Sequence, residues 1–214
     1  MKTKPLSFLL CAICFMLFFS CSKDDAGSVG GSQSEFGEVG NTIDWTVGQF
    51  GITGASMTVT ALENGVSTLT CSGTASSSTY VDILRAVPTE RFPGTVNITG
   101  NTVQATVNAK ITDEGMQVVF NNGSKLTLVN YNASVGDKYS ATVGGVTLQN
   151  EVVQRSTEDD YFWGGMLIKV ITVKYTSHAP GINYVEHYYN HKWGLVGLAV
   201  YFEDGSVKYA GCAC

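Results

Sequence analysis

Apolar side chains at every second residue are the feature that most constrains this chain. The clearest run is Thr102–Thr112, where Val, Ala and Ile alternate with Thr, Gln, Asn and Lys. Successive side chains point to opposite faces of a β-strand, whereas an α-helix repeats about every 3.6 residues. Strict alternation therefore predicts a strand with one buried face and one solvent-facing face.

Turn residues separate similar segments elsewhere in the chain. Asn64-Gly65, Asn122-Gly123 and Asp204-Gly205 each lie between two apolar-patterned runs, and such pairs tolerate the positive φ of tight hairpin turns. Short strands joined by these turns predict an all-β fold of antiparallel meanders, either a β-sandwich or a lipocalin-like barrel or half-barrel. Residues 80–88 alone have apolar residues at helical spacing, so we expect at most one short helix.

Two further strands are predicted in the last third of the chain. Met166–Thr176 is apolar on both faces over part of its length, which predicts one long, central strand. Ile182–Asn190 alternates, with Tyr184, Glu186 and Tyr188 expected on one face and Val185, His187 and Tyr189 on the other.

The first 20 residues have the order of a secretory signal. Lys2 and Lys4 precede an apolar run from Leu6 to Phe19, which is shorter than the roughly 20 residues that span a bilayer. A charged start followed by a short apolar run is typical of a signal peptide that is removed from the mature protein.

A small residue and a cysteine, Ser20-Cys21, end the apolar run. This arrangement resembles the lipidation signal of bacterial lipoproteins. The resemblance implies cleavage before Cys21 and an acyl anchor of the palmitate type on that residue, so that the membrane is a partner through the lipid. The alternative is an ordinary secreted protein with a chance cysteine at this position.

Two motifs resemble those of Bacteroidota-type surface lipoproteins. The first is the short acidic export tag Ser22, Lys23, Asp24 and Asp25. The second is a C-terminal pattern over about 80 residues, which this chain leaves at Gly197, where Lys is usual. Its matching positions are Val135-Gly136-Asp137-Lys138, Gly164-Gly165, Tyr184, Trp193-Gly194-Leu195-Val196 and Asp204-Gly205. The resemblance implies an outer-membrane lipoprotein whose β-rich domain, of unknown function, faces the cell exterior.

Three segments are expected: a signal peptide at 1–20, a flexible acidic Gly/Ser tether at 21–40 and a β-rich domain at 41–214. Aromatic side chains become larger after Asn132, so a subdivision near residue 133 is an alternative. The formal net charge of −5 becomes −7 without residues 1–20, which hold two Lys and no acid. An acidic chain with no Lys/Arg cluster after Lys4 argues against a nucleic-acid partner.

Three cysteines lie outside the signal and the lipidation site: Cys71, Cys212 and Cys214. We expect a disulfide between Cys71 and one of the other two, with buried thiols as the alternative. His187 and His191 are four residues apart, but on a strand this spacing separates them by about 13 Å, too far for one zinc ion. No metal and no cofactor are therefore expected.

The sequence contains no Gly-x-Ser-x-Gly elbow and no Gly-rich phosphate loop before a helix. We therefore expect no catalytic residues and no enzyme, with a hydrolase as the least favoured alternative. Aromatic residues crowd the last third, and Trp163, Tyr188, Tyr189 and Trp193 are the candidate ligand-binding residues, with core packing as their alternative role. The expected function is a non-catalytic module that binds a glycan, a small apolar ligand or an envelope protein; the alternative is a structural subunit of an envelope complex.

Overall fold

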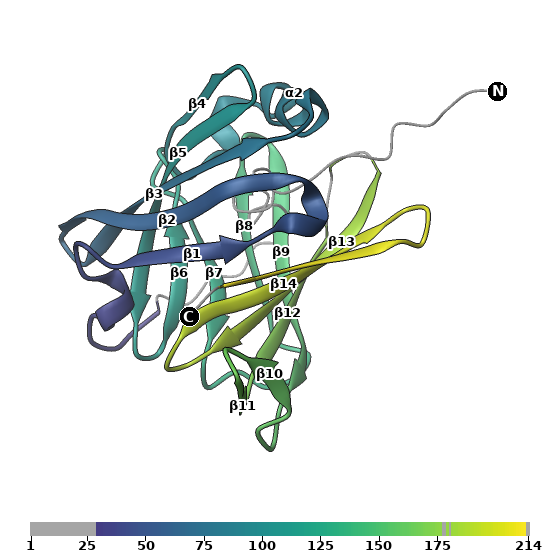
Figure 1. Cartoon of the computed structure of the whole chain (residues 1–214). Helices are drawn as coiled ribbons and strands as arrows, with labels where there is room; N and C mark the ends of the chain where they lie inside the picture. Colours follow the sequence, from purple (N-terminus) through teal and green to yellow (C-terminus); the bar gives the residue numbers. More distant parts are fainter. Residues whose placement is uncertain (1–28, 177–178, 180, 213–214) are drawn as a thin grey trace.

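The structure is a computed structural model that describes residues 29–176, 179 and 181–212. Over these residues it is all-β, with antiparallel strands and one short α-helix, which confirms the predicted fold class (Figure 1). The predicted hairpin at Asn64-Gly65 is also confirmed, since these residues have φ of 51° and 75° between β2 and β3.

The elements have the following bounds. The strands are β1 (Thr42–Thr46), β2 (Ile52–Glu63), β3 (Val66–Ala75), β4 (Val96–Thr99), β5 (Thr102–Thr112), β6 (Gly115–Val119), β7 (Lys125–Asn130), β8 (Lys138–Val143), β9 (Val146–Arg155), β10 (Tyr161–Trp163), β11 (Met166–Ile168), β12 (Ile171–Thr176), β13 (Ile182–Asn190), β14 (Gly194–Phe202) and β15 (Val207–Cys212). The helices are α2 (Ser78–Ala86) and the 3-10 turns η1 (Glu35–Gly37), η2 (Gly48–Phe50) and η3 (Thr89–Arg91).

One 13-stranded sheet forms a nearly closed barrel. Its strand order is β7-β6-β5-β3-β2-β1-β15-β14-β13-β12-β9-β8, and β4 pairs with β5 beside this path. The two ends of the path meet, because Asn150 Nδ2 donates to Thr127 O at 2.9 Å and Ser124 Oγ donates to Thr142 O at 3.5 Å. Of the two predicted architectures, the structure therefore adopts the barrel.

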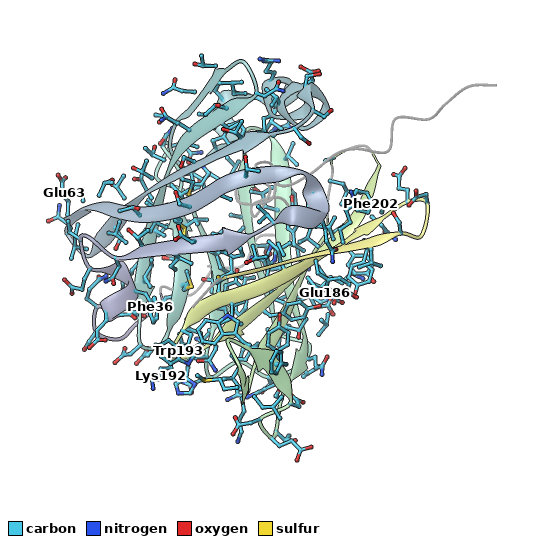
Figure 2. All side chains as sticks on the ribbon, viewed as in Figure 1. Phe36, Glu63, Glu186, Lys192, Trp193 and Phe202 are labelled. Carbon is cyan, nitrogen blue, oxygen red and sulfur yellow. The ribbon has the colours of Figure 1, made fainter. Side chains whose placement is uncertain are left out.

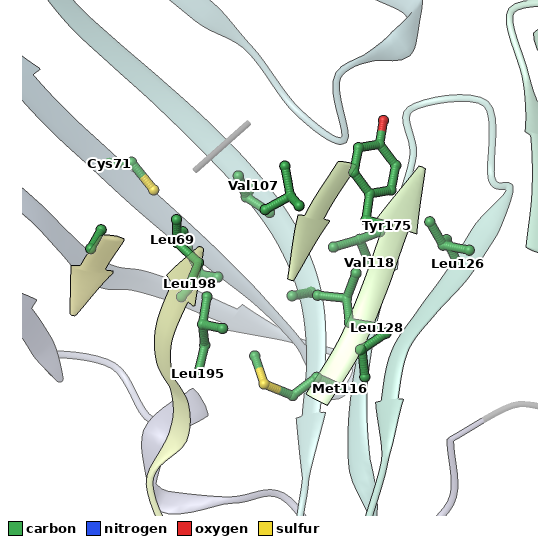
Figure 3. Close-up of a cluster of buried hydrophobic side chains, with 14 of the residues drawn as sticks. Leu69, Cys71, Val107, Met116, Val118, Leu126, Leu128, Tyr175, Leu195 and Leu198 are labelled. Carbon is green, nitrogen blue, oxygen red and sulfur yellow. The ribbon is translucent and has the colours of Figure 1, made fainter. Parts of the chain in front are cut away.

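The barrel is filled by the inward-facing half of each alternating strand. Figure 3 shows Leu69, Val107, Val118, Leu128 and Leu198 converging from different strands. This interior core runs from Trp45 to Ala210 and so contains residues from both sides of position 133. Leaving these side chains in water would cost about 1.5–3 kcal/mol for each large aliphatic residue, which makes the interior the main stabilising element of the fold.

The prediction of one long strand over Met166–Thr176 is wrong. The strand is interrupted at Lys169-Val170. β11 pairs with β10 in a separate two-stranded sheet, and only β12 belongs to the barrel sheet, between β9 and β13. The break has a packing cause, since Ile168 and Val170 are buried in a second apolar cluster outside the barrel. Asn190 Nδ2 holds the bend by donating to Lys169 O at 2.7 Å.

Residues 29–40, predicted as part of the tether, lie against the barrel. Lys110 Nζ donates to Val29 O, Ser32 N donates to Asp113 Oδ1 at 2.8 Å, and Ser34 N donates to Ile111 O. Val29 is only 2 % exposed. The chain is therefore fixed to the β5–β6 turn from residue 29 onwards, which leaves few residues between this contact and Cys21.

Helix α2 begins two residues before the predicted segment and ends at Ala86, ahead of Pro88. Its buried residues, Val81 and Leu84, are the apolar pair that predicted it. Among the residues that the structure describes, no helix has the length and apolarity needed to cross a membrane.

Candidate functional site

One end of the barrel, here called the tether end, gathers most of the unusual features. The β5–β6 turn at Asp113, the β13–β14 turn at His191–Trp193 and the N-terminal segment 29–37 all lie there. Figure 2 shows Phe36, Lys192 and Trp193 close together at this end. Two kinds of concavity open from it, one polar and one apolar.

The polar concavity is a cleft of about 340 Å³, here called the end cleft. Its base is buried and largely apolar, whereas its rim is exposed and charged. The base consists of Tyr131, Tyr189, Val170, Ile171 and Ser156, and the rim consists of Asp113, Asn132, Arg155, Lys169 and His191. The volume lies within the range of about 300–1,000 Å³ that is usual for small-molecule sites.

The rim carries more positive than negative charge, although the chain as a whole is acidic with a net charge of −5. Arg155 and Lys169 share the rim with one carboxylate, that of Asp113, whose Oδ1 already accepts the Ser32 N–H. Arg155 Nη1 donates to Ala133 O at 2.6 Å, which fixes the guanidinium at the rim. A guanidinium and an ammonium at one opening suit a carboxylate or another anionic group of a ligand.

Tyr189 at the base of the cleft has a buried hydroxyl with no hydrogen-bond partner. Burial raises the pKa of Tyr189 well above its usual value, and the nearby Tyr131 acts in the same direction. The hydroxyl is therefore neutral and can donate one hydrogen bond. A buried donor without a hydrogen-bond partner costs about 1–3 kcal/mol, so this hydroxyl destabilises the folded protein.

The apolar concavities lie inside the barrel and are small. One, of about 40 Å³, is lined by Trp45, Cys71 and Tyr189 among others; its neighbour, of about 20 Å³, is closed by Phe36 and Trp193. Tyr189 lines both the inner cavity and the end cleft, so its ring separates them. These volumes hold at most a few waters, which favours the end cleft over the interior as a ligand site.

Three of the four predicted ligand residues come together outside the barrel. Trp163, Trp193 and Tyr188 belong to the second apolar cluster, and the Trp163 and Trp193 rings lie 5.3 Å apart. Trp163 is only 9 % exposed, so these rings form a small core rather than an exposed patch. The ring of Trp193 in this core also lies 6.3 Å from the ring of Phe36. Tyr189 points to the opposite face of β13 and reaches the end cleft instead.

The departure from the lipoprotein pattern at Gly197 has a structural reason. A Cβ at this position would lie 2.4 Å from Tyr161 Oη of the β10–β11 hairpin. The Tyr161 ring stacks near Tyr188 at 5.0 Å on the outer face of the sheet. The missing side chain therefore gives the hairpin room to pack against β14.

The histidines and cysteines that the structure describes lie apart from one another. His187 is buried inside the barrel, whereas His191 is exposed on the β13–β14 turn. Among the described residues, no group of three or more His, Cys, Asp or Glu side chains could hold a metal ion. Cys71 faces the interior, and the Cys212 thiol donates to Leu195 O at 2.8 Å. Cys214 lies outside the described residues, so the disulfide stays a prediction.

The lipidation and export residues Cys21 to Asp25 also lie outside the described residues. Tyr131, Arg155 and Lys169 could not be recognised as site residues in the sequence, because they come from three separate strand ends. A sequence signal that could have suggested Lys169 is its position as a cation inside an apolar run, a position that Lys174 shares.

Comparisons with known proteins give a distant fold match. No family model matches the chain, and no curated protein is similar to it. A solved structure from Bacteroides fragilis, of a protein predicted to be exported and with a YmcC-like fold, aligns with a TM-score of 0.44 and 11% identity. The alignment covers 91% of this chain and 97% of that chain. A similarity at this level carries no functional argument.

Proposed function

We propose that this protein is an exported, lipid-anchored binding protein that takes a small acidic saccharide, or a related hydroxylated carboxylate, in the end cleft. The observation that carries the proposal is the cleft itself, where Arg155 and Lys169 stand above a buried tyrosine base. Aromatic rings offer flat apolar faces to a sugar ring, and the two cations offer charged hydrogen bonds to its carboxylate.

The proposed role is non-catalytic. Glycoside hydrolysis needs two suitably placed carboxyl groups, whereas Asp113 is the single carboxylate that lines the end cleft. Its Oδ1 accepts the Ser32 N–H, so the group is committed to fixing the N-terminal segment. This supports a binding site rather than a hydrolase.

The proposed location is the outer membrane, with an acyl group on Cys21 and the barrel facing the cell exterior. Support comes from the signal-like order of residues 1–20 and the acidic residues after Cys21. A glycan met at the cell surface fits the ligand chemistry of the cleft. An envelope protein is the partner in the alternative proposal, a structural subunit.

The test is calorimetric titration of the mature protein with glucuronate, with glucose as the uncharged comparison. Glucuronate is expected to bind more tightly than glucose, and Lys169→Gln is expected to weaken it by about tenfold, since a hydrogen bond to a charged group contributes about 1.5–3 kcal/mol. Lys125→Gln is the matched control, because Lys125 is an exposed cation on β7 outside the cleft.

Equal affinity for glucuronate and glucose would contradict a role for the cationic rim. Binding of the neutral apolar dye N-phenyl-1-naphthylamine, with no response to glucuronate and no effect of Lys169→Gln, would instead favour an apolar ligand inside the barrel. No binding of either probe class would favour the structural-subunit alternative.

Tyr189→Phe should separate the stability of the empty protein from its affinity for ligand. Removing the unmet hydroxyl is expected to raise the free energy of unfolding of the empty protein by about 1 kcal/mol, because no hydrogen bond of Tyr189 is lost. The same change is expected to leave glucuronate binding unchanged, because the hydroxyl has no surface open to the end cleft. Chemical denaturation and titration measure the two effects, and a loss of stability in Tyr189→Phe would show that the hydroxyl is already satisfied in the empty protein.

A further inference from the structure

The β10–β11 hairpin exposes three large apolar side chains on a protein that otherwise exposes few. Phe162 is 73 % exposed, Leu167 is 56 % exposed and Met166 is 46 % exposed. The remaining exposed large apolar residues among those described are Tyr209 on β15 and, in loops, Val39 and Val135. Half of this exposed apolar set is thus concentrated on two strands of three residues each.

The strand register determines which face of the hairpin each side chain occupies. Tyr161 pairs with Ile168 and Trp163 pairs with Met166, whereas Phe162 pairs with Leu167. Opposite residues of an antiparallel pair share a face. Trp163 and Ile168 therefore anchor the hairpin to the barrel through the second apolar cluster, and Phe162 and Leu167 are left pointing away from it.

The hairpin lies at the tether end of the barrel. The Trp193 ring lies 5.3 Å from Trp163 of the hairpin and 6.3 Å from Phe36 of the N-terminal segment, so Trp163 and Phe36 are at most 11.6 Å apart. Figure 1 shows β10 and β11 projecting beyond the end of the barrel on the side where η1 lies. The hairpin and the incoming chain thus share one end of the molecule.

The chain between the proposed lipid and the barrel is short. Val29 is already buried against the barrel, eight residues after Cys21. In any conformation, eight residues span at most about 29 Å. An acyl anchor on Cys21 would therefore hold Val29, at the tether end, within about 29 Å of the bilayer surface.

We infer that the β10–β11 hairpin is a second membrane contact, with Phe162 and Leu167 inserted at the boundary between lipid headgroups and acyl chains. This inference rests on the proposed lipid anchor for its orientation, but the affinity of the hairpin for a bilayer does not depend on that anchor. The acidic residues 158–160, just before β10, disfavour an anionic surface. The contact is therefore apolar and is tested best with phosphatidylcholine, a zwitterionic lipid.

The first experiment uses the acylated mature protein in phosphatidylcholine vesicles. The photoreactive residue p-benzoylphenylalanine replaces Phe162 or, as a control, Tyr209, which is 53 % exposed and lies on β15. Irradiation is expected to give phosphatidylcholine adducts at position 162 and few at position 209, as measured by mass spectrometry. An acylated protein with equal adduct yields at the two positions would overturn the membrane contact.

The second experiment uses the mature polypeptide made without acyl groups, so that its outcome does not depend on the anchor. Flotation with phosphatidylcholine vesicles should show weak binding that falls at least about tenfold in Phe162→Ser/Leu167→Ser. Val39→Ser/Val135→Ser is the matched control, since these residues are 59 % and 60 % exposed. Thermal melting checks that both double variants remain folded.

The two experiments separate the two proposals. An intact mass without acyl groups on the exported protein would overturn the anchor alone, and the flotation result would still decide the hairpin. Equal vesicle binding of both double variants would overturn the hairpin contact. Adducts from position 162 to another envelope protein in cells, without lipid adducts, would also overturn it and would favour a protein partner.

Discussion

Acidification from pH 7 to pH 4.5 is expected to cost the fold about 2.5 kcal/mol through His187 alone. Burial lowers the pKa of His187 from 6.5 to about 3, against a smaller opposing effect of its hydrogen bond to the Val173 backbone. The unfolded chain therefore takes up a proton at His187 below pH 6.5, whereas the folded chain does not. Stability due to this residue is lost as the pH falls from about 6.5 towards 3.

His187 lies in the wall of the barrel next to the base of the end cleft. Its ring is 6.1 Å from that of Tyr189 and 6.5 Å from that of Tyr175, and its Nε2 is buried without a hydrogen-bond partner. A charge at this position would have no acid to balance it among these neighbours. Protonation of His187 therefore favours unfolding of the chain, because these neighbours offer no acid to form an ion pair with it.

The measurement is the free energy of unfolding by urea at pH 7 and pH 4.5, for the wild type and His187→Leu. Carboxylates titrate over the same range in both proteins, so the difference between the two pH effects isolates His187. His191→Gln, on the exposed turn, is the matched control and should retain the wild-type pH effect. An unchanged pH effect in His187→Leu would mean that His187 becomes protonated without unfolding.

Trp193→Ala is expected to cost about 3 kcal/mol of stability, at the low end for loss of a large aromatic side chain because Trp193 is only half-buried. The ring contacts Trp163 of the hairpin and Phe36 of the N-terminal segment, and Lys192 Nζ lies 4.6 Å from its centre. It also closes one interior cavity. One side chain thus joins three separate parts of the tether end.

Chemical denaturation of Trp193→Ala, Trp193→Phe and Phe36→Ala measures this coupling. Trp193→Phe should recover much of the loss, because a ring remains between Phe36 and Trp163. Trp193→Ala combined with Phe36→Ala should cost less than the sum of the two single changes, since residues in contact are not additive. Full additivity would show that the Phe36 contact contributes little.

Strand positions and turns could be predicted from the sequence to a large extent. Val103 to Ile111 alternate because one face of β5 must be buried, and Asn64-Gly65 turns because few residues tolerate its φ values. These are local requirements, so a local pattern reports them. The prediction failed at Lys169-Val170, where the burial of Ile168 and Val170 in a distant cluster bends an apolar run that reads as one strand.

The sequence did not distinguish a β-sandwich from a barrel, because both folds bury every second side chain of a strand. The choice depends on whether the two ends of the sheet path, β7 at one end and β8 with β9 at the other, approach each other. The contact between Asn150 of β9 and Thr127 of β7 joins residues 23 positions apart in the chain. The candidate ligand-binding aromatic residues show the same limit of a local sequence pattern. Alternation correctly placed Tyr188 and Tyr189 on opposite faces, but it could not tell which face would be covered by the hairpin.

By itself, the sequence determined the all-β class, the hairpin turns and the alternating faces, because each depends on residues that are neighbours along the chain. Only the tertiary structure decided that the sheet nearly closes, that residues 29–40 dock at the β5–β6 turn, and that Arg155, Lys169 and Tyr131 share one cleft. These features bring together residues far apart in the chain, and their geometry is set by the twist and closure of the whole sheet rather than by any local pattern.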